Sequence, residues 1–186
     1  MSKPEQTDVY DPVRNSWSRL PDLRIGRFKA AAVHYSNRLF VSGGTAQDRP
    51  LNECEVLHQK SEKWKLFGFL NFSRSAHQMV VFEDRLYVLG GVDLMGTLKT
   101  VEYYSINTEG TWKSAPELLS PRSNFSATVF QEKIFILGGE DQRYDNTFVD
   151  FFDGSTWQRF CKIPPDVVVL TAMVFPKVPK ELASKM

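Results

Sequence analysis

Three sequence markers recur with nearly the same spacing along the 186-residue chain, and this internal repeat constrains the fold more than any single motif does. Glycine pairs that end apolar segments stand at 43–44, 90–91 and 138–139, tryptophans at 17, 64, 112 and 157, and arginines at 27, 74 and 122. Glycine pairs and arginines step by 47 and 48 residues, and tryptophans by 47, 48 and 45. Three markers that share one period indicate a chain built from similar structural units.

Each unit contains two apolar segments separated by a short polar turn, a pattern that predicts a β-hairpin. The three copies read RFKAAAVHYSNRLFVSGG, RSAHQMVVFEDRLYVLGG and RSNFSATVFQEKIFILGG. A third apolar segment follows the glycines, and a fourth short segment follows the tryptophan. Four short antiparallel strands per unit, without any helical period, predict the blades of an all-β propeller.

Paired glycines after an apolar strand, followed by segments such as VYDPVRNSW that end in tryptophan, resemble kelch repeats. The resemblance covers residues 8 to about 175 and is to the C-terminal propeller of the BTB-kelch (kelch-like) proteins. It implies a kelch-type β-propeller, in which the glycines let the backbone leave the second strand and approach its neighbours closely. A dinucleotide site would instead need GxGxxG opening a helix, whereas GGVDLMG leads into another strand.

The repeat predicts a partial propeller with about three complete four-stranded blades and terminal strand fragments. The expected segments are a polar N-terminal segment at 1–7, the last two strands of an incomplete blade at 8–24, complete blades at 27–69, 74–117 and 122–163, the first strand of a further incomplete blade at 166–177, and a polar tail at 178–186. Propellers usually have four to eight blades, so we interpret the chain as a fragment or short isoform of a longer protein. The alternative is that the two termini pair into a fourth, incomplete blade.

Charge and composition disfavour several classes of partner. With 23 basic and 22 acidic residues the net charge is +1, which gives no reason to expect binding to nucleic acid or to a membrane. The longest nearly apolar segment, VVVLTAMVF at 167–175, is too short to cross a bilayer, and MSKPEQTDVYDP lacks the apolar part of a signal peptide. The two cysteines have no metal-type spacing and suit reduced thiols. We therefore expect a cytoplasmic protein.

No constellation of residues predicts catalysis. The three histidines, His34, His58 and His77, fall at different heights and in different strands of the predicted blades, which does not suit convergence on one metal ion. A GxSxG nucleophile elbow is missing, and nothing matches the tyrosine, cysteine and histidine copper site of kelch-like oxidases. We expect a binding scaffold that is not an enzyme and uses no cofactor or metal.

Two sets of loops are expected to share one face of the propeller and to carry binding. They are the loops after the glycine pairs, at 45–51, 92–98 and 140–146, and the connections between blades, at 20–27, 69–74 and 117–122. The candidate partner-binding residues there are Arg27, Arg74, Arg122, Asp48, Arg49, Asp93, Asp141, Arg143 and Tyr144. Arginine suits bidentate binding of carboxylate or phosphorylated groups. The alternative is a structural role, in which the arginines cap backbone carbonyls or pair with the next blade.

The resemblance to BTB-kelch propellers implies that these arginines, the serines Ser75 and Ser123 that follow two of them, and the loops after the glycines line a peptide-binding face. Phe28 replaces the serine in the first copy. The resemblance also implies that a protein or peptide substrate is recruited to a cullin-type ubiquitin ligase through BTB and linker domains that these residues do not include. A cytoskeletal, actin-associated or scaffold kelch protein is the alternative.

Overall fold

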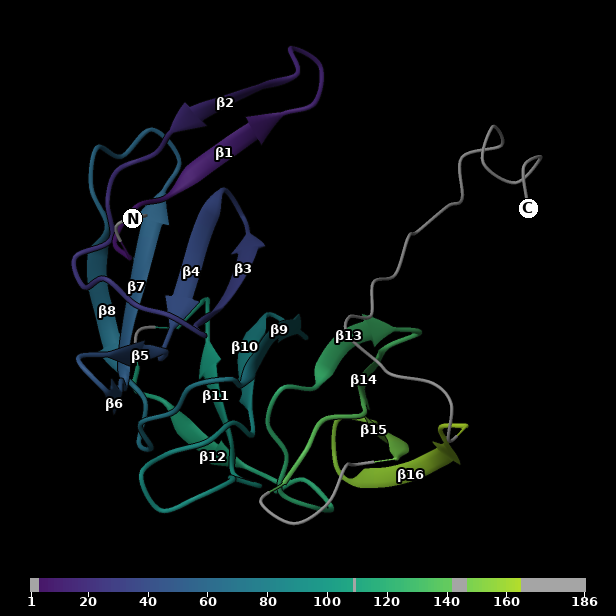
Figure 1. Cartoon of the computed structure of the whole chain (residues 1–186). Helices are drawn as coiled ribbons and strands as arrows, with labels where there is room; N and C mark the ends of the chain where they lie inside the picture. The colour runs from purple at the N-terminus through teal and green to yellow at the C-terminus, as the bar shows by residue number, and fades with distance from the viewer. Residues whose placement is uncertain (1–3, 109, 142–146, 165–186) are drawn as a thin grey trace.

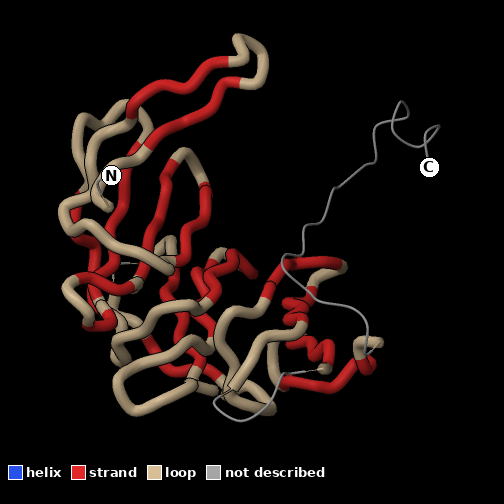
Figure 2. Tube along the Cα trace, in the orientation of Figure 1, coloured by secondary structure: helices blue, strands red, loops and turns tan. Residues whose placement is uncertain are grey.

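The computed structural model describes residues 4–108, 110–141 and 147–164. Within these ranges the chain forms only strands, turns and loops (Figure 2), which confirms the all-β prediction. No helix capable of crossing a membrane occurs in the same ranges.

Three four-stranded sheets follow one another along the chain (Figure 1). The first blade consists of β3 (Ala31–Tyr35), β4 (Arg38–Ser42), β7 (Glu53–His58) and β8 (Lys65–Phe69). The second consists of β9 (Gln78–Phe82), β10 (Arg85–Leu89), β11 (Val101–Ser105) and β12 (Lys113–Ala115). The third consists of β13 (Ser126–Phe130), β14 (Lys133–Leu137), β15 (Phe148–Phe152) and β16 (Trp157–Lys162). Neighbouring strands within each sheet are antiparallel and consecutive in the blade.

Two short hairpins accompany the blades. The strands β1 (Asp8–Asp11) and β2 (Ser16–Arg19) form a separate two-stranded sheet before the first blade. The strands β5 (Thr45–Ala46) and β6 (Arg49–Pro50) form a hairpin within the loop that follows the first glycine pair. The predicted partial propeller is therefore confirmed. The expected strand at 166–177 and the tail at 178–186 lie outside the described residues.

Tight turns join the first two strands of every blade, as the sequence predicts. Both residues of each turn have positive φ, the combination that suits the right-handed twist of a two-residue hairpin. These turn residues are Ser36 and Asn37, Glu83 and Asp84, and Gln131 and Glu132.

Adjacent blades pack face to face, and the hydrophobic core lies between them. Side chains alternate along a strand, so every second residue of a blade points to the neighbouring blade. Phe40 and Val56 of the first blade belong to one buried cluster with Val88 and Trp112 of the second. A corresponding cluster joins the second and third blades; it includes Phe82, Tyr87, Leu89, Ile136 and Phe152.

The first glycine pair is the point where the first blade meets the connection into the second. A Cβ atom on Gly43 would lie 2.5 Å from the carbonyl oxygen of Arg74 and 2.7 Å from the His77 ring. The following Gly44 donates its N–H to that same Arg74 oxygen at 2.9 Å. The second glycine pair repeats this contact against Arg122, with distances of 2.6 and 2.9 Å. The glycine pairs therefore serve close packing between blades.

We predict that Gly43→Ala lowers the free energy of unfolding by at least about 2 kcal/mol, because φ at this position is +54° and the added methyl meets a backbone oxygen. Chemical denaturation measures this change. The matched control is Gly110→Ala, whose Cβ would lie 3.9 Å from its nearest neighbour and which should be neutral or slightly stabilising. Equal effects of the two substitutions would contradict the packing role of Gly43.

Candidate partner-binding face

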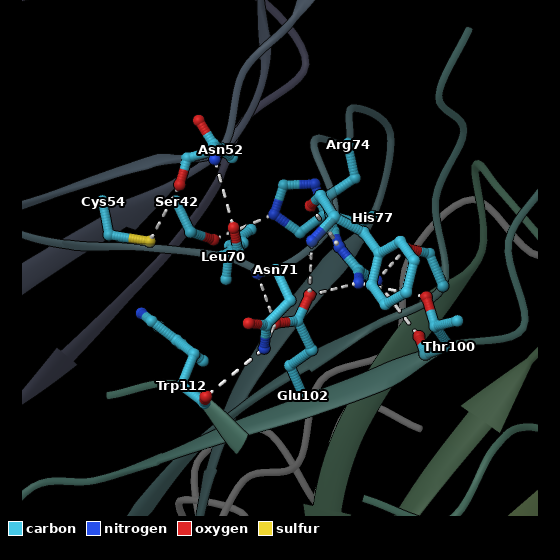
Figure 3. Close-up of polar contacts among 12 residues, drawn as sticks. Ser42, Asn52, Cys54, Leu70, Asn71, Arg74, His77, Thr100, Glu102 and Trp112 are labelled. Atoms are coloured by element: carbon cyan, nitrogen blue, oxygen red, sulfur yellow. Dashed lines mark hydrogen bonds and ion pairs between the residues drawn. The ribbon is translucent and has the colours of Figure 1, made fainter. Parts of the chain in front are cut away.

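A buried guanidinium fixes the connection that enters the second blade (Figure 3). Arg74 Nη2 lies 2.6 Å from Glu102 Oε1, and both side chains are fully buried. Arg74 Nη1 donates to the carbonyl oxygens of Gly90 and Thr100 at 2.7 and 3.0 Å. Arg74 Nε donates to the carbonyl of Phe72 at 3.4 Å. The guanidinium is therefore fully engaged within its own blade and its connection.

The carboxylate of this pair, Glu102, also binds the connection that enters the second blade. Glu102 accepts hydrogen bonds from the backbone N–H groups of Asn71 and Phe72 at 2.7 and 3.2 Å, and from the Asn71 side-chain amide at 2.7 Å. We call this arrangement the connector clip: an arginine at the end of an inter-blade connection, a carboxylate on the third strand of the blade, and the backbone groups that both of them bind. The clip satisfies polar groups that would be costly to bury unpaired.

The connector clip recurs in the other two complete blades. In the first blade Arg27 pairs with Glu55 and donates to the carbonyls of Gly43 and Glu53 at 2.7 and 2.9 Å. Glu55 accepts from the backbone N–H groups of Arg24 and Ile25 at 2.8 and 3.3 Å. Arginine and acid are 28 residues apart in every copy.

The clip of the third blade is less complete. Here the acid is the shorter Asp150, which pairs with Arg122 at 2.5 Å and also accepts from Arg159 Nε at 3.2 Å. Arg122 Nη1 donates to the carbonyls of Gly138 and Phe148 at 3.1 and 3.4 Å, longer than the matching bonds of Arg74. Arg122 Nε has no hydrogen-bond partner among the described residues. An unpaired buried donor makes the third connector clip the weakest of the three.

Burial lowers the pKa of Arg74 and of Arg122 below the ordinary arginine value, and the neighbouring carboxylates oppose this shift. The three arginines have exposed fractions of 6, 0 and 0% in chain order, so their guanidinium groups present no surface to a partner. The sequence left two roles open, and the contacts of Arg27, Arg74 and Arg122 are those of the structural role. Each arginine pairs with a carboxylate of its own blade and not with the next blade.

We predict that Arg74→Ala lowers the free energy of unfolding by about 3–5 kcal/mol, because it leaves the Glu102 carboxylate buried without its counter-ion. Urea denaturation followed by tryptophan fluorescence measures the change. Arg49→Ala is the control; this side chain is exposed on β6, and the expected change is within about 0.5 kcal/mol. A small effect at Arg74 would show that the clip is not structural.

A buried histidine joins the first and second blades beside the Arg74 clip. His77 Nε2 lies 2.9 Å from Ser42 Oγ on β4 (Figure 3). Burial lowers the pKa of His77 to about 3, and the charges of Arg74 and Arg27 add to this shift. The ring is therefore neutral at physiological pH.

We predict that this histidine makes the fold sensitive to mild acid. The unfolded state takes up the proton near pH 6.5, whereas the folded pKa is about 3, so stability falls as pH decreases from 6.5 toward 3. The loss should be about 2 kcal/mol between pH 6.5 and 5. Denaturation at several pH values should show this slope in His34→Gln, an exposed control, and not in His77→Gln. Equal slopes in both variants would contradict this assignment.

The inter-blade connections and the loops after the glycine pairs meet at one end of the sheets, as the sequence predicts. Isolated backbone bridges join Phe28 to Thr45, Ser75 to Val92, and Ser123 to Glu140. We call the surface built by these two sets of loops the connector face. Ser75 and Ser123 are buried within it, with exposed fractions of 5 and 6%.

The remaining candidate residues occupy different positions on the connector face. Asp48 and Arg49 are exposed at the β5–β6 hairpin. Asp93 is half-buried and accepts from the backbone N–H groups of Met95 and Gly96 at 2.7 and 3.0 Å, so it shapes its own loop. Asp141 is also half-buried. Arg143 and Tyr144 lie outside the described residues.

The connector face also carries exposed apolar side chains, which were not among the candidate residues expected from the sequence. Phe28, Leu94 and Met95 have exposed fractions of 60, 78 and 91%. Phe28 precedes β3 beside the first glycine loop, and the other two stand at the tip of the loop at 92–98. Large apolar groups held on ordered loops are suited to contact with another protein.

Within the described ranges, no three His, Cys, Asp or Glu side chains gather as a possible ion site. His34 and His58 are exposed on β3 and β7, apart from the buried His77.

Comparison with known proteins gives one family match and several partial relatives. A family model described as the KLHDC2/KLHL20/DRC7 Kelch-repeats domain matches residues 2–171. An F-box/kelch-repeat protein of Arabidopsis thaliana is 33% identical over 107 residues, which cover 55% of this chain and 28% of that protein.

Two further relatives match similar lengths of the chain. Kelch-like protein 15 of Mus musculus is 26% identical over 102 residues, 55% of this chain and 17% of the relative. Alpha-scruin of Limulus polyphemus is 30% identical over 121 residues, 61% of this chain and 13% of the relative. The matched region thus spans less than a third of the length of each of these relatives.

Proposed function

Because the chain belongs to the kelch-repeat family, whose model matches residues 2–171, we propose that its connector face docks a protein or peptide substrate. A kelch-repeat domain is a protein–protein interaction module. The partner would contact the connector face, at one end of the blades, through the exposed side chains described above.

The observation that carries the proposal is the exposure of Phe28, Leu94 and Met95 on loops whose bases are ordered. The connector clips hold the inter-blade connections, and backbone bridges hold the glycine loops against them. Binding then costs little ordering of the loops, and apolar anchors of this size supply most of the contact energy. Asp48 and Arg49, exposed nearby, would select a partner with complementary charges at the rim.

We further propose that this face recognises substrates for a cullin-type ubiquitin ligase, as part of a BTB-kelch adaptor. Support comes from the match to Kelch-like protein 15 and from the resemblance of the repeats to BTB-kelch propellers. The BTB and linker domains of such an adaptor would lie outside these residues. A cytoskeletal, actin-associated or scaffold role is the alternative, and both functions imply a cytoplasmic location.

We predict that the triple variant Phe28→Asp, Leu94→Asp and Met95→Asp loses the partners of the wild-type chain without losing stability, because these side chains are exposed. Quantitative affinity purification from cytoplasmic extract should show at least a tenfold loss of the specific partners. Val13→Asp is the control, because Val13 is 94% exposed in the turn between β1 and β2. This turn lies at the opposite end from the β5–β6 hairpin (Figure 1). Partners retained by the triple variant, or lost equally in the control, would contradict a role for the connector face.

Two readouts separate the ligase role from the alternative. A partner that depends on the connector face should accumulate, with less attached ubiquitin, when an excess of this chain competes for it in cells. Purified chain should stay in the supernatant when filamentous actin is sedimented. Pelleting with actin that the triple variant abolishes would favour the filament role.

A further inference from the structure

The face of the third blade that points away from the second carries an aromatic cluster that the described residues leave partly exposed. A groove of about 520 Å³ there is lined by Phe130, Phe135, Leu137, Phe151 and Phe160, among others. Phe130 and Phe160 have exposed fractions of 45 and 64%. The ring centroid of Phe135 is 5.7 Å from those of both Phe151 and Phe160, so the cluster forms one continuous apolar surface.

The internal repeat shows how the equivalent surface of the preceding blade is used. Phe82, Tyr87 and Leu89 stand 48 residues before Phe130, Phe135 and Leu137, and their exposed fractions are 4, 3 and 0%. They are covered by the third blade; the Phe152 ring, for example, lies 6.3 Å from Phe82 and 5.9 Å from Tyr87. These positions are therefore built to be covered by a following blade.

First strands make the inner part of each such contact. β9 packs against β3, and β13 packs against β9, so the first strands of successive blades lie side by side. One backbone hydrogen bond marks each step: Ala76 N–H donates to Lys29 O at 2.9 Å, and Asn124 N–H donates to Ala76 O at 3.0 Å. The Asn124 oxygen is the next position in this series.

The chain contains a matching segment at the required distance. Residues 170–175 read LTAMVF, and residues 125–130 read FSATVF. The offset of 45 residues equals the step from Trp112 to Trp157. Eight residues, 163–170, lie between the end of β16 and Thr171, as eight residues, 70–77, lie between β8 and β9. This segment lies outside the described residues.

We propose that residues 170–175 dock on the inner part of this apolar face as the first strand of a further blade. In this arrangement Val169 N–H donates to Asn124 O, which continues the series of backbone bonds. Ala172 and Val174 then face the third blade, since they correspond to Ala127 and Val129, which pack against the second-blade cluster.

The docked segment would lack a connector clip. The position of Arg122 corresponds to Val167, which offers no guanidinium for a buried carboxylate. Attachment then depends on apolar contact and backbone hydrogen bonds, so one charge on the inward face should release it. This inference concerns a different surface from the connector face and does not depend on the proposed function.

Hydrogen–deuterium exchange of the full chain, read by mass spectrometry on peptides spanning 166–176, tests the proposal. Amides of a docked strand should exchange at least tenfold more slowly in the wild type than in Val174→Asp. Met173→Asp is the matched control. In a strand the side chain of residue 173 points to the face opposite that of Val174, so the amides of this segment should stay protected in Met173→Asp.

Two results would overturn the proposal. One is equally fast exchange of the segment in the wild type and in Val174→Asp. The other is a dimer in light scattering that Phe160→Asp dissociates while the segment exchanges fast, because the apolar face would then be covered by a second copy of the chain.

Discussion

One buried ion pair in each complete blade determines where the chain passes from blade to blade. Burying a guanidinium and a carboxylate is costly unless nearly every donor and acceptor is satisfied, and the Arg74–Glu102 pair achieves this with the backbone of its own connection. The pair thereby fixes the Arg74 carbonyl, which the preceding glycine pair contacts. The arginine and glycine markers are thus two parts of one joint, which explains why they recur with the same period.

The joint also determines which side chains of the connector face are available to contact a partner. Arg27, Arg74 and Arg122 are buried in the connector clips. The groups of the connector face that can contact a partner are therefore the exposed side chains between these arginines. Phe28, Leu94 and Met95 are held on loops anchored by buried pairs and backbone bridges. The connector clip at Asp150 is the least complete of the three, since Arg122 Nε has no hydrogen-bond partner among the described residues.

The sequence was sufficient for the architecture and less so for the site. The blades and the face shared by the two sets of loops were predicted from the repeat period, the turn residues and the glycine pairs. These features are tied to the backbone conformation, which every copy of the repeat must adopt. The role of the arginines was not decided, since spacing alone does not show whether a charge is buried. A signal was present: Glu55, Glu102 and Asp150 each follow an arginine by 28 residues. The burial of His77 had no such signal, because it depends on contact between two blades.

The central claim is that the Glu102 carboxylate holds the connection into the second blade, and amide hydrogen exchange of Asn71 and Phe72 by NMR tests it most directly. Both N–H groups should be protected in the wild type and should lose that protection in Glu102→Ala, while the Arg24 and Ile25 amides bound to Glu55 keep theirs. Fast exchange of Asn71 and Phe72 in the wild type, or protection that survives removal of the carboxylate, would contradict the account.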